Sequence, residues 1–285
     1  MFSVALFLVI MSGLLHAVWN LLAKRSFNPV VFLWSFQWVA VVVYLPWALT
    51  AMGRHPVPMR GWMLLGLTAA AHGTYVVLLA NTYSLGDLSQ VYPLMRGVSP
   101  ILVPVLGVAL LGERLSAPGW LGVGAVIAGI GMLGEWRRRM ASGSPRPLSQ
   151  ATWLALGVGL SIAAYTTLDK VTLHDVPAVT LNDGSNLGNL IALSLWALRS
   201  RVIKMEWAAH WKTIIMGGII SPGGHLLFLT ALRMAPVARL PPIREIGTVF
   251  ATILGIVVLK EAQGWRRMVA SGLITIGVIF LATWG

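Results

Sequence analysis

The stretch Arg-Arg-Arg-Met-Ala-Ser-Gly-Ser-Pro-Arg-Pro, residues 137–147, is the longest and most basic interruption in a chain of 285 residues, and it lies at the midpoint. Apolar sequence extends from it in both directions. Hydrophobic residues make up 57% of the chain and charged residues only 11%, whereas a soluble domain has about 25% charged residues. Because so few charges cannot cover a water-soluble surface, the composition predicts an all-α integral membrane protein.

About 20 residues are needed for a helix to cross a membrane, and ten apolar segments near that length can be placed on the chain. Polar or helix-breaking stretches separate them, and they cover 2–23, 29–51, 61–81, 88–111, 117–135, 151–169, 177–198, 208–231, 237–259 and 264–284. The first segment has neither a basic region before it nor a cleavage site after it, so we expect a spanning helix and not a signal peptide.

The sequences on the two sides of the midpoint stretch repeat one another. A shift of 148 residues places a proline, an arginine and a glutamate of the first half on the same residue types in the second: Pro93 on Pro241, Arg96 on Arg244 and Glu113 on Glu261. We therefore predict a five-helix repeat over 1–140, a basic linker over 141–150 and a second five-helix repeat over 151–285. An odd number of helices per repeat inverts the second copy, and inverted repeats are typical of secondary transporters that alternate access around a midplane site.

Lys and Arg residues concentrate in alternate loops of this topology. The loops after the first, fifth, seventh and ninth helices hold 13 of them, and the loops after the second, fourth, sixth and eighth hold 5. The positive-inside rule then predicts a cytoplasmic linker with both termini outside. The same rule explains the net charge of +12, so no nucleic-acid partner is expected. The predicted location is the inner membrane of a bacterium.

Polar side chains inside spans are costly in hydrocarbon, so they mark candidate functional positions. His16, Trp19 and Asn20 are spaced by three and four residues and share one face of the first helix. They predict one wall of a substrate cavity, although hydrogen bonds to a neighbouring helix would explain the same pattern. Other helices extend the expected wall with His72, Tyr75, Tyr165 and His225.

Two arginines lie in the proline-rich segments that the repeat aligns. Arg96 follows Tyr92 and Pro93, and Arg244 precedes Glu245. Each guanidinium stays charged and needs a carboxylate, a carbonyl or an anionic ligand. One interpretation is a cationic clamp for a carboxylate or phosphate, which arginine binds in bidentate fashion. The other is a structural ion pair in which Glu245 neutralises one of the arginines.

Proton coupling would require a titratable group inside the membrane. Asp183 and Glu245 are the acids that the predicted boundaries place well inside spans, and His16 titrates near physiological pH. These three residues are therefore the proton-coupling candidates. Asp183 belongs to an unusually polar segment with Asn182 and Asn186, which we expect to face inward.

Several other kinds of chemistry are not expected. The chain has no Gly-x-Ser-x-Gly, His-Glu-x-x-His or P-loop motif, and its lack of cysteine excludes thiolate ligands. A metal site from His16, His72 and His225 would require three distant helices to converge, so no metal is predicted. Because the motifs above are missing, no cofactor and no enzymatic activity are predicted either. Glycines in 117–135 and 264–284 predict close helix packing or a homodimer interface there.

The sequence resembles the drug/metabolite transporter superfamily, in its ten-helix EamA-type branch. The resemblance covers nearly the whole chain and rests on His16-Ala17-Val18-Trp19-Asn20, on Leu111-Gly112-Glu113-Arg114-Leu115 and on their weaker repeats in the second half. It implies two inverted five-helix repeats around a central cavity. The cavity would be lined by helices 1, 3, 4, 6, 8 and 9, which carry the candidate residues above, with helices 5 and 10 peripheral.

The function expected from these observations is secondary active transport. The predicted protein exports a small anionic or zwitterionic metabolite, such as an amino acid or organic acid, across the inner membrane by alternating access. Its partners would be the small-molecule substrate, the lipid bilayer, a coupled proton and a second copy of the chain. The alternatives are a flippase for a lipid-linked anionic headgroup, a multidrug exporter, a membrane-embedded enzyme and a membrane scaffold.

Overall fold

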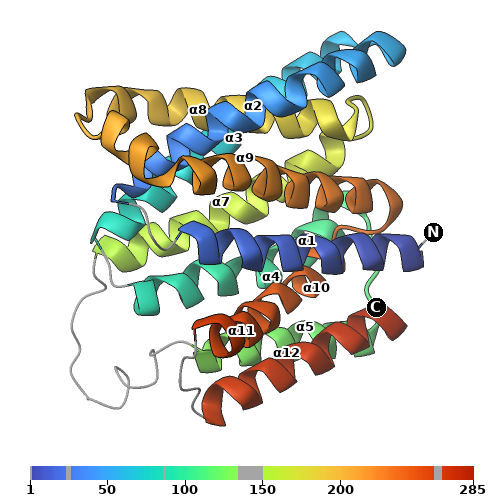
Figure 1. Ribbon diagram of the computed structural model, residues 1–285. Helices are drawn as coiled ribbons and strands as arrows, with labels where there is room; N and C mark the ends of the chain where they lie inside the picture. Colours follow the sequence, from blue (N-terminus) through green and yellow to red (C-terminus); the bar gives the residue numbers. More distant parts are fainter. Residues whose placement is uncertain (1, 24–26, 86–87, 134–149, 260–264) are drawn as a thin grey trace. The chain divides into compact units, whose positions relative to one another are not determined.

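Helices account for all the regular secondary structure in the computed structural model, which describes residues 1–285 except 1, 24–26, 86–87, 134–149 and 260–264 (Figure 1). In chain order the helices are α1 (Phe2–Ala23), α2 (Pro29–Arg54), α3 (Met59–Leu85), α4 (Leu88–Leu111), α5 (Ala117–Leu133), α7 (Gln150–Thr172), α8 (Ala178–Arg199), α9 (Ile203–Met234), α10 (Leu240–Arg244), α11 (Ile246–Leu259) and α12 (Trp265–Trp284).

The ninth predicted helix, 237–259, is broken in two. α10 ends at Arg244, α11 begins at Ile246, and Glu245 lies between them. Pro241 is among the first residues of α10, where the N–H that proline lacks has no partner within the helix. The break places Glu245 at a junction between two short helices and not in the middle of a continuous one.

The eighth predicted helix, 208–231, is longer than expected. α9 begins at Ile203 and kinks at His210, whose backbone is not helical (φ −125°, ψ 16°). The short first part carries Glu206, which is buried and accepts hydrogen bonds from the backbone N–H groups of Phe27 and Asn28, both at 3.1 Å. Those groups precede α2, so the first part of α9 is fixed by the start of α2.

The described residues divide into two compact units. Unit 1 comprises residues 1–77 and 168–234, and unit 2 comprises residues 78–167 and 235–285. Each unit contains residues from both halves of the chain. In unit 1, α1 and α2 pack against α9, and α2 also packs against α8. In unit 2, α5 packs along α12, and α10 packs against α4 (Figure 1).

Glycines bring α5 and α12 into close contact in unit 2. A Cβ atom at Gly122 would lie 2.8 Å from the carbonyl oxygen of Gly277, and one at Gly277 would lie 2.5 Å from that of Gly122. Neither position has room for a side chain. The close packing predicted from the glycines is therefore confirmed at Gly122 and Gly277. A Cβ atom at Gly124, Gly131 or Gly272 would meet nothing within 4 Å, and a homodimer interface there stays a prediction.

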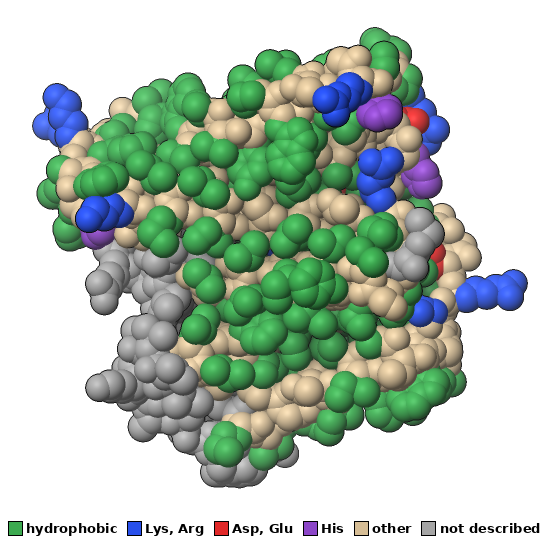
Figure 2. Space-filling model, turned by 45° about the vertical axis from the view of Figure 1, so that its right-hand side comes forward, with side chains coloured by type: hydrophobic (Ala, Val, Ile, Leu, Met, Phe, Trp, Pro, Cys, Tyr) green, Lys and Arg blue, Asp and Glu red, His purple; other side chains and the backbone are tan. Residues whose placement is uncertain are grey.

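The surface carries large apolar side chains where a soluble protein would carry charges. Trp47 and Leu67 are each 58% exposed, and hydrophobic side chains cover much of the face drawn in Figure 2. Four helices among the described residues are long and apolar enough to cross a membrane, namely Pro29–Arg54, Met59–Thr82, Gln150–Thr172 and Ile203–Met234. Such a surface fits contact with lipid acyl chains.

The segment after α4 is held by a turn that requires glycine. Gly112 has a φ of 66°, which favours glycine because it has no Cβ atom. The turn positions Glu113, whose two carboxylate oxygens accept hydrogen bonds from the backbone N–H groups of Val237 at 2.8 Å and Ala238 at 2.7 Å. Glu113 therefore connects the end of α4 to the segment that leads into α10.

We expect Glu113→Gln to lower the free energy of unfolding by about 2 kcal/mol, because the amide NH₂ group would face one of the two backbone donors. The measurement is thermal unfolding of the detergent-purified protein, followed by tryptophan fluorescence. Arg114→Ala, at the exposed neighbouring position, is the matched control. Equal melting temperatures for Glu113→Gln and the parent protein would contradict the proposed role of the two hydrogen bonds.

Candidate functional site

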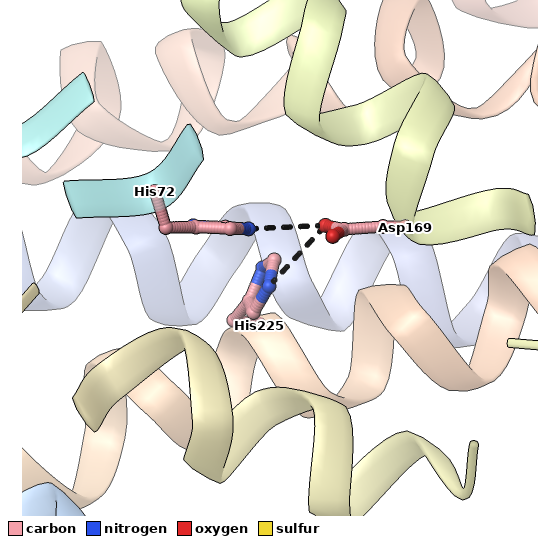
Figure 3. A group of neighbouring side chains, drawn as sticks. All are labelled: His72, Asp169 and His225. Atoms are coloured by element: carbon pink, nitrogen blue, oxygen red, sulfur yellow. Dashed lines mark hydrogen bonds and ion pairs between the residues drawn. The ribbon is translucent and has the colours of Figure 1, made fainter. Parts of the chain in front are cut away.

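Two histidines and an aspartate meet in unit 1, and we call them the histidine–aspartate cluster: His72 of α3, Asp169 of α7 and His225 of α9 (Figure 3). The Nε2 atom of His72 lies 3.2 Å from Oδ2 of Asp169, and Nε2 of His225 lies 3.9 Å from the same oxygen. The two imidazole rings are 5.4 Å apart between centroids. Three helices thus direct titratable side chains at one point.

The spacing of residues on α3 and α7 explains how His72 meets Asp169. Thr68 lies one turn before His72 and Thr172 lies one turn after Asp169, so each threonine shares a face with its cluster residue. The two threonine hydroxyls are 3.2 Å apart and buried. This polar contact fixes the register of α3 against α7 at the level of the cluster.

Asp169 is the most deeply buried member of the cluster. Its side chain is 0% exposed, and its second oxygen, Oδ1, has no hydrogen-bond partner. The neighbouring Lys170 points to α9, where its ammonium group donates to the carbonyl oxygen of Leu232. A buried carboxylate oxygen without a donor is costly, so the cluster is suited to binding a positive group.

A second group of charges lies in unit 2, and we call it the arginine–glutamate cluster: Arg96 of α4, Arg244 at the end of α10 and Glu245 at the break. A guanidinium nitrogen of Arg96 lies 3.1 Å from a carboxylate oxygen of Glu245, and these side chains are 15% and 7% exposed. Arg244 also interacts electrostatically with Glu245. Both of the alternatives that the sequence left open, clamp and ion pair, therefore concern the same three residues.

The arginine–glutamate cluster contains more basic than acidic side chains. With Arg96, Arg244 and Glu245 ionised, two positive charges face one negative charge. Each guanidinium carries several N–H donors in a planar fork that can bind a carboxylate in bidentate fashion. The cluster is therefore suited to binding an anionic group, or a group with both signs of charge.

α8 carries a third set of buried polar side chains, again in unit 1. Asn182 is fully buried, and neither its side-chain oxygen nor its side-chain nitrogen has a hydrogen-bond partner. The same holds for one oxygen each of Asp183 and Asn189. Buried polar atoms of this kind indicate contact with water or a ligand. Asp183 belongs to this set and to neither cluster.

The remaining predicted site residues lie on α1, α3, α4 and α7. His16 and Tyr75 are half-buried in α1 and α3, and Tyr165 is buried in α7. The side chains of Trp19, Asn20 and Tyr92 are not among those that the structure describes, so the predictions for these three residues lie outside the described part of the chain. Of the predicted residues, the structure brings together His72 with His225, and Arg96 with Arg244 and Glu245.

Asp169 is the functional residue that the sequence analysis did not select. The sixth predicted helix ended at Asp169, which made Asp169 and Lys170 look like a polar boundary, whereas α7 continues to Thr172. A signal was present, because Asp169 lies four residues after Tyr165 on the same helical face. The sequence analysis expects the helices of His16, His72 and His225 to lie too far apart for a shared site, whereas the structure brings His72 and His225 together at Asp169.

Comparison with known proteins identifies the class of membrane protein to which this all-helical chain belongs. The sequence profile of the EamA-like transporter family matches residues 3–134 and 150–283, one copy on each side of the midpoint stretch. The chain therefore belongs to the EamA-like transporter family, and its apolar helices are those of a multi-pass membrane protein. This confirms the resemblance that the sequence indicated.

Curated relatives are similar over part of their length. A Sinorhizobium sp. protein named "Uncharacterized transporter in cobO 3'region" is 37% identical over 73 residues, or 26% of this chain and 51% of the relative. "Uncharacterized transporter sll1164" of Synechocystis sp. (strain ATCC 27184 / PCC 6803 / Kazusa) is 31% identical over 109 residues, or 35% of this chain and 30% of the relative. The matches thus span about half of one relative and less of the other.

The fold also has a counterpart among solved structures. A chain described as "Crystal structure of protein" superimposes with a TM-score of 0.80 over 99% of this chain and 98% of its own length. Its sequence is only 18% identical. This similarity supports the all-helical fold.

Proposed function

We propose that this transporter is a secondary active exporter of small anionic or zwitterionic metabolites, such as amino acids or organic acids. It would act by alternating access across a bacterial inner membrane, with its two inverted five-helix repeats moving around the substrate. The observation that supports this proposal is the arginine–glutamate cluster in unit 2, which holds buried charges of both signs at the broken ninth span.

The charge balance of the cluster favours this class of substrate. A net positive charge inside a membrane protein is costly unless an anion compensates it, and an arginine fork binds a carboxylate through two parallel hydrogen bonds. A substrate carboxylate would bind the guanidinium of Arg244 while Arg96 stays paired with Glu245. For a zwitterion, Glu245 would in addition accept from the ammonium group.

The break in the ninth predicted span supports a substrate site at the arginine–glutamate cluster. In transporters with inverted repeats, substrates bind where spanning helices are discontinuous, because the interrupted backbone provides polar groups inside the membrane. The break between α10 and α11 lies at Glu245. A proton that binds at Asp183, Glu245 or His16 would drive export, and each of these residues stays a candidate for coupling.

The first experiment is a ligand screen by thermal unfolding of the detergent-purified protein against amino acids, organic acids, phosphorylated metabolites and cationic drugs. A ligand at 100 times its dissociation constant stabilises the folded state by about 2.7 kcal/mol. We expect carboxylates or zwitterions to raise the melting temperature, and Arg244→Met to abolish that increase. Arg233→Met, at an exposed arginine that ends α9, is the control that keeps it.

Two results would overturn the substrate class. Stabilisation by cationic compounds alone would identify the arginines as structural. Stabilisation by carboxylates that survives in Arg244→Met would locate the anion elsewhere. Transport of the stabilising compound into or out of liposomes containing the protein then tests the direction and the proton dependence.

A further inference from the structure

The histidine–aspartate cluster has no role in the substrate site proposed above, which lies in unit 2. We propose that His72, Asp169 and His225 bind a divalent transition-metal ion such as Zn²⁺. This proposal is independent of the proposed substrate. It rests on three side chains from α3, α7 and α9, whose potential ligand atoms all lie within 4.8 Å of one another.

The separations fit a metal after small adjustments. In a tetrahedral site with bonds of about 2.0–2.2 Å, neighbouring ligand atoms lie about 3.4 Å apart. The histidine nitrogens stand 3.2 Å and 3.9 Å from the Asp169 oxygen, on either side of that value. The three side chains point toward one another (Figure 3), so a metal ion between them would be within reach of all three ligand atoms.

The contacts within the histidine–aspartate cluster leave one carboxylate oxygen of Asp169 without a hydrogen-bond donor. His72 and His225 both point to Oδ2 of Asp169, while Oδ1, on the same fully buried carboxylate, has no hydrogen-bond partner. When it is ionised, the Asp169 carboxylate places a negative charge between the two imidazoles. A divalent ion would neutralise it and would coordinate Asp169 directly, so it would serve the group that the protein's own donors leave unsatisfied.

The ligand types select among cations. Two imidazoles and one carboxylate suit Zn²⁺, Co²⁺ or Ni²⁺, whereas Mg²⁺ and Ca²⁺ prefer oxygen ligands alone. Three protein ligands leave one position open to water or to another ligand. The ion would link the first half of the chain, through α3, to the second half, through α7 and α9.

The local structure holds the ligands in place before any ion binds. The hydroxyl contact between Thr68 and Thr172 lies one turn away along α3 and α7. Lys170 is fixed to the carbonyl oxygen of Leu232 on α9, which joins α7 to the helix that carries His225. These contacts hold α3, α7 and α9 together near the level of the three proposed ligands.

The test is Co²⁺ titration of the full-length protein, purified in detergent without a polyhistidine tag and freed of metal with a chelator. We expect one equivalent of Co²⁺ to produce the visible absorption of a four-coordinate ion, and Zn²⁺ to abolish it by displacement. Zn²⁺ should also raise the melting temperature, and Mg²⁺ should leave it unchanged. The variants His72→Gln, Asp169→Asn and His225→Gln should each weaken Co²⁺ binding at least about tenfold.

Controls separate this site from metal binding elsewhere. His174→Gln removes an exposed histidine just after α7 and should leave Co²⁺ binding unchanged. Among the ligand variants, His225→Gln is expected to disturb the fold least, because His225 is the least buried member and the farther histidine from Asp169. Size-exclusion chromatography verifies its folding. The proposal is overturned if the parent protein gives no Co²⁺ band, or if folded His225→Gln binds Co²⁺ with unchanged affinity.

Discussion

Replacement of Glu245 by alanine is expected to lower the free energy of unfolding by about 3–5 kcal/mol, because it removes one partner of a buried ion pair. The carboxylate lies 3.1 Å from Arg96 in a part of unit 2 where both side chains are largely buried. It also faces Arg244. Without it, two guanidinium groups would repel each other in a region of low dielectric constant.

Removing both partners should restore much of the loss. The double variant Arg96→Met/Glu245→Met removes both ends of the 3.1 Å ion pair together, so that only Arg244 loses a neighbouring carboxylate, and well-packed apolar replacements of a buried pair are often neutral or stabilising. The measurement is a double-mutant cycle on unfolding free energies in detergent, with Arg96→Met and Glu245→Met as the single variants. Additive effects of the two single substitutions would show that the pair does not contribute to stability.

The same cycle separates the two roles of the arginine–glutamate cluster. A double variant that folds but no longer responds to carboxylate ligands would link the pair to binding. One that folds and still responds would leave Arg244 as the anion-binding residue. Unfolding free energy and ligand response are thus measured on the same samples. The structural role of the ion pair and its role in anion binding are therefore tested separately.

The class of fold was predictable because the length of each apolar segment and the match between the two halves can both be read directly from the sequence. Apolar segments of about 20 residues can only be spanning helices, and the match of Arg96 to Arg244 needs no structure. The helix boundaries were less predictable. α7 extends three residues beyond its predicted end, which turns Asp169 from a boundary residue into a buried one.

The partners of the site residues were not predictable from the sequence, because they depend on which helices touch. Nothing in the spacing of His72 and His225 indicates that both face Asp169. The break at Glu245 was equally hidden, since Pro241 and Pro242 indicate a loosened helix but not the residue at which a new helix begins. Tertiary packing determines both features, and apolar periodicity does not encode it.

The contact between α3 and α8 is a further feature that the sequence analysis did not identify. The prediction for α8 rested on its asparagines and did not include the small residues between them. On α3, Ala69 and Gly73 are four residues apart, and on α8 so are Gly188 and Ala192. A Cβ atom at Gly73 would lie 3.1 Å from the Cβ of Ala192. Small residues at this spacing let two membrane helices approach closely.

Gly188→Val is therefore expected to have the largest effect of any glycine substitution in unit 1. A Cβ atom at Gly188 would lie 2.7 Å from the carbonyl carbon of Ala69 and 2.9 Å from its Cα atom. These are backbone atoms, so no side chain can rotate away, and α3 and α8 must separate. Overpacking of this kind costs about 3 kcal/mol, which would lower the melting temperature by on the order of 10 °C.

The matched control is Gly66→Val, a glycine of α3 whose added Cβ would meet no atom within 4 Å. It should leave the melting temperature nearly unchanged, because the new side chain extends into open space. The two variants differ only in what the valine touches. Because Ala69 and Gly73 flank His72 on α3, folded Gly188→Val should also weaken Co²⁺ binding at the histidine–aspartate cluster. Equal melting temperatures for the two variants would show that α3 and α8 do not meet at Gly188.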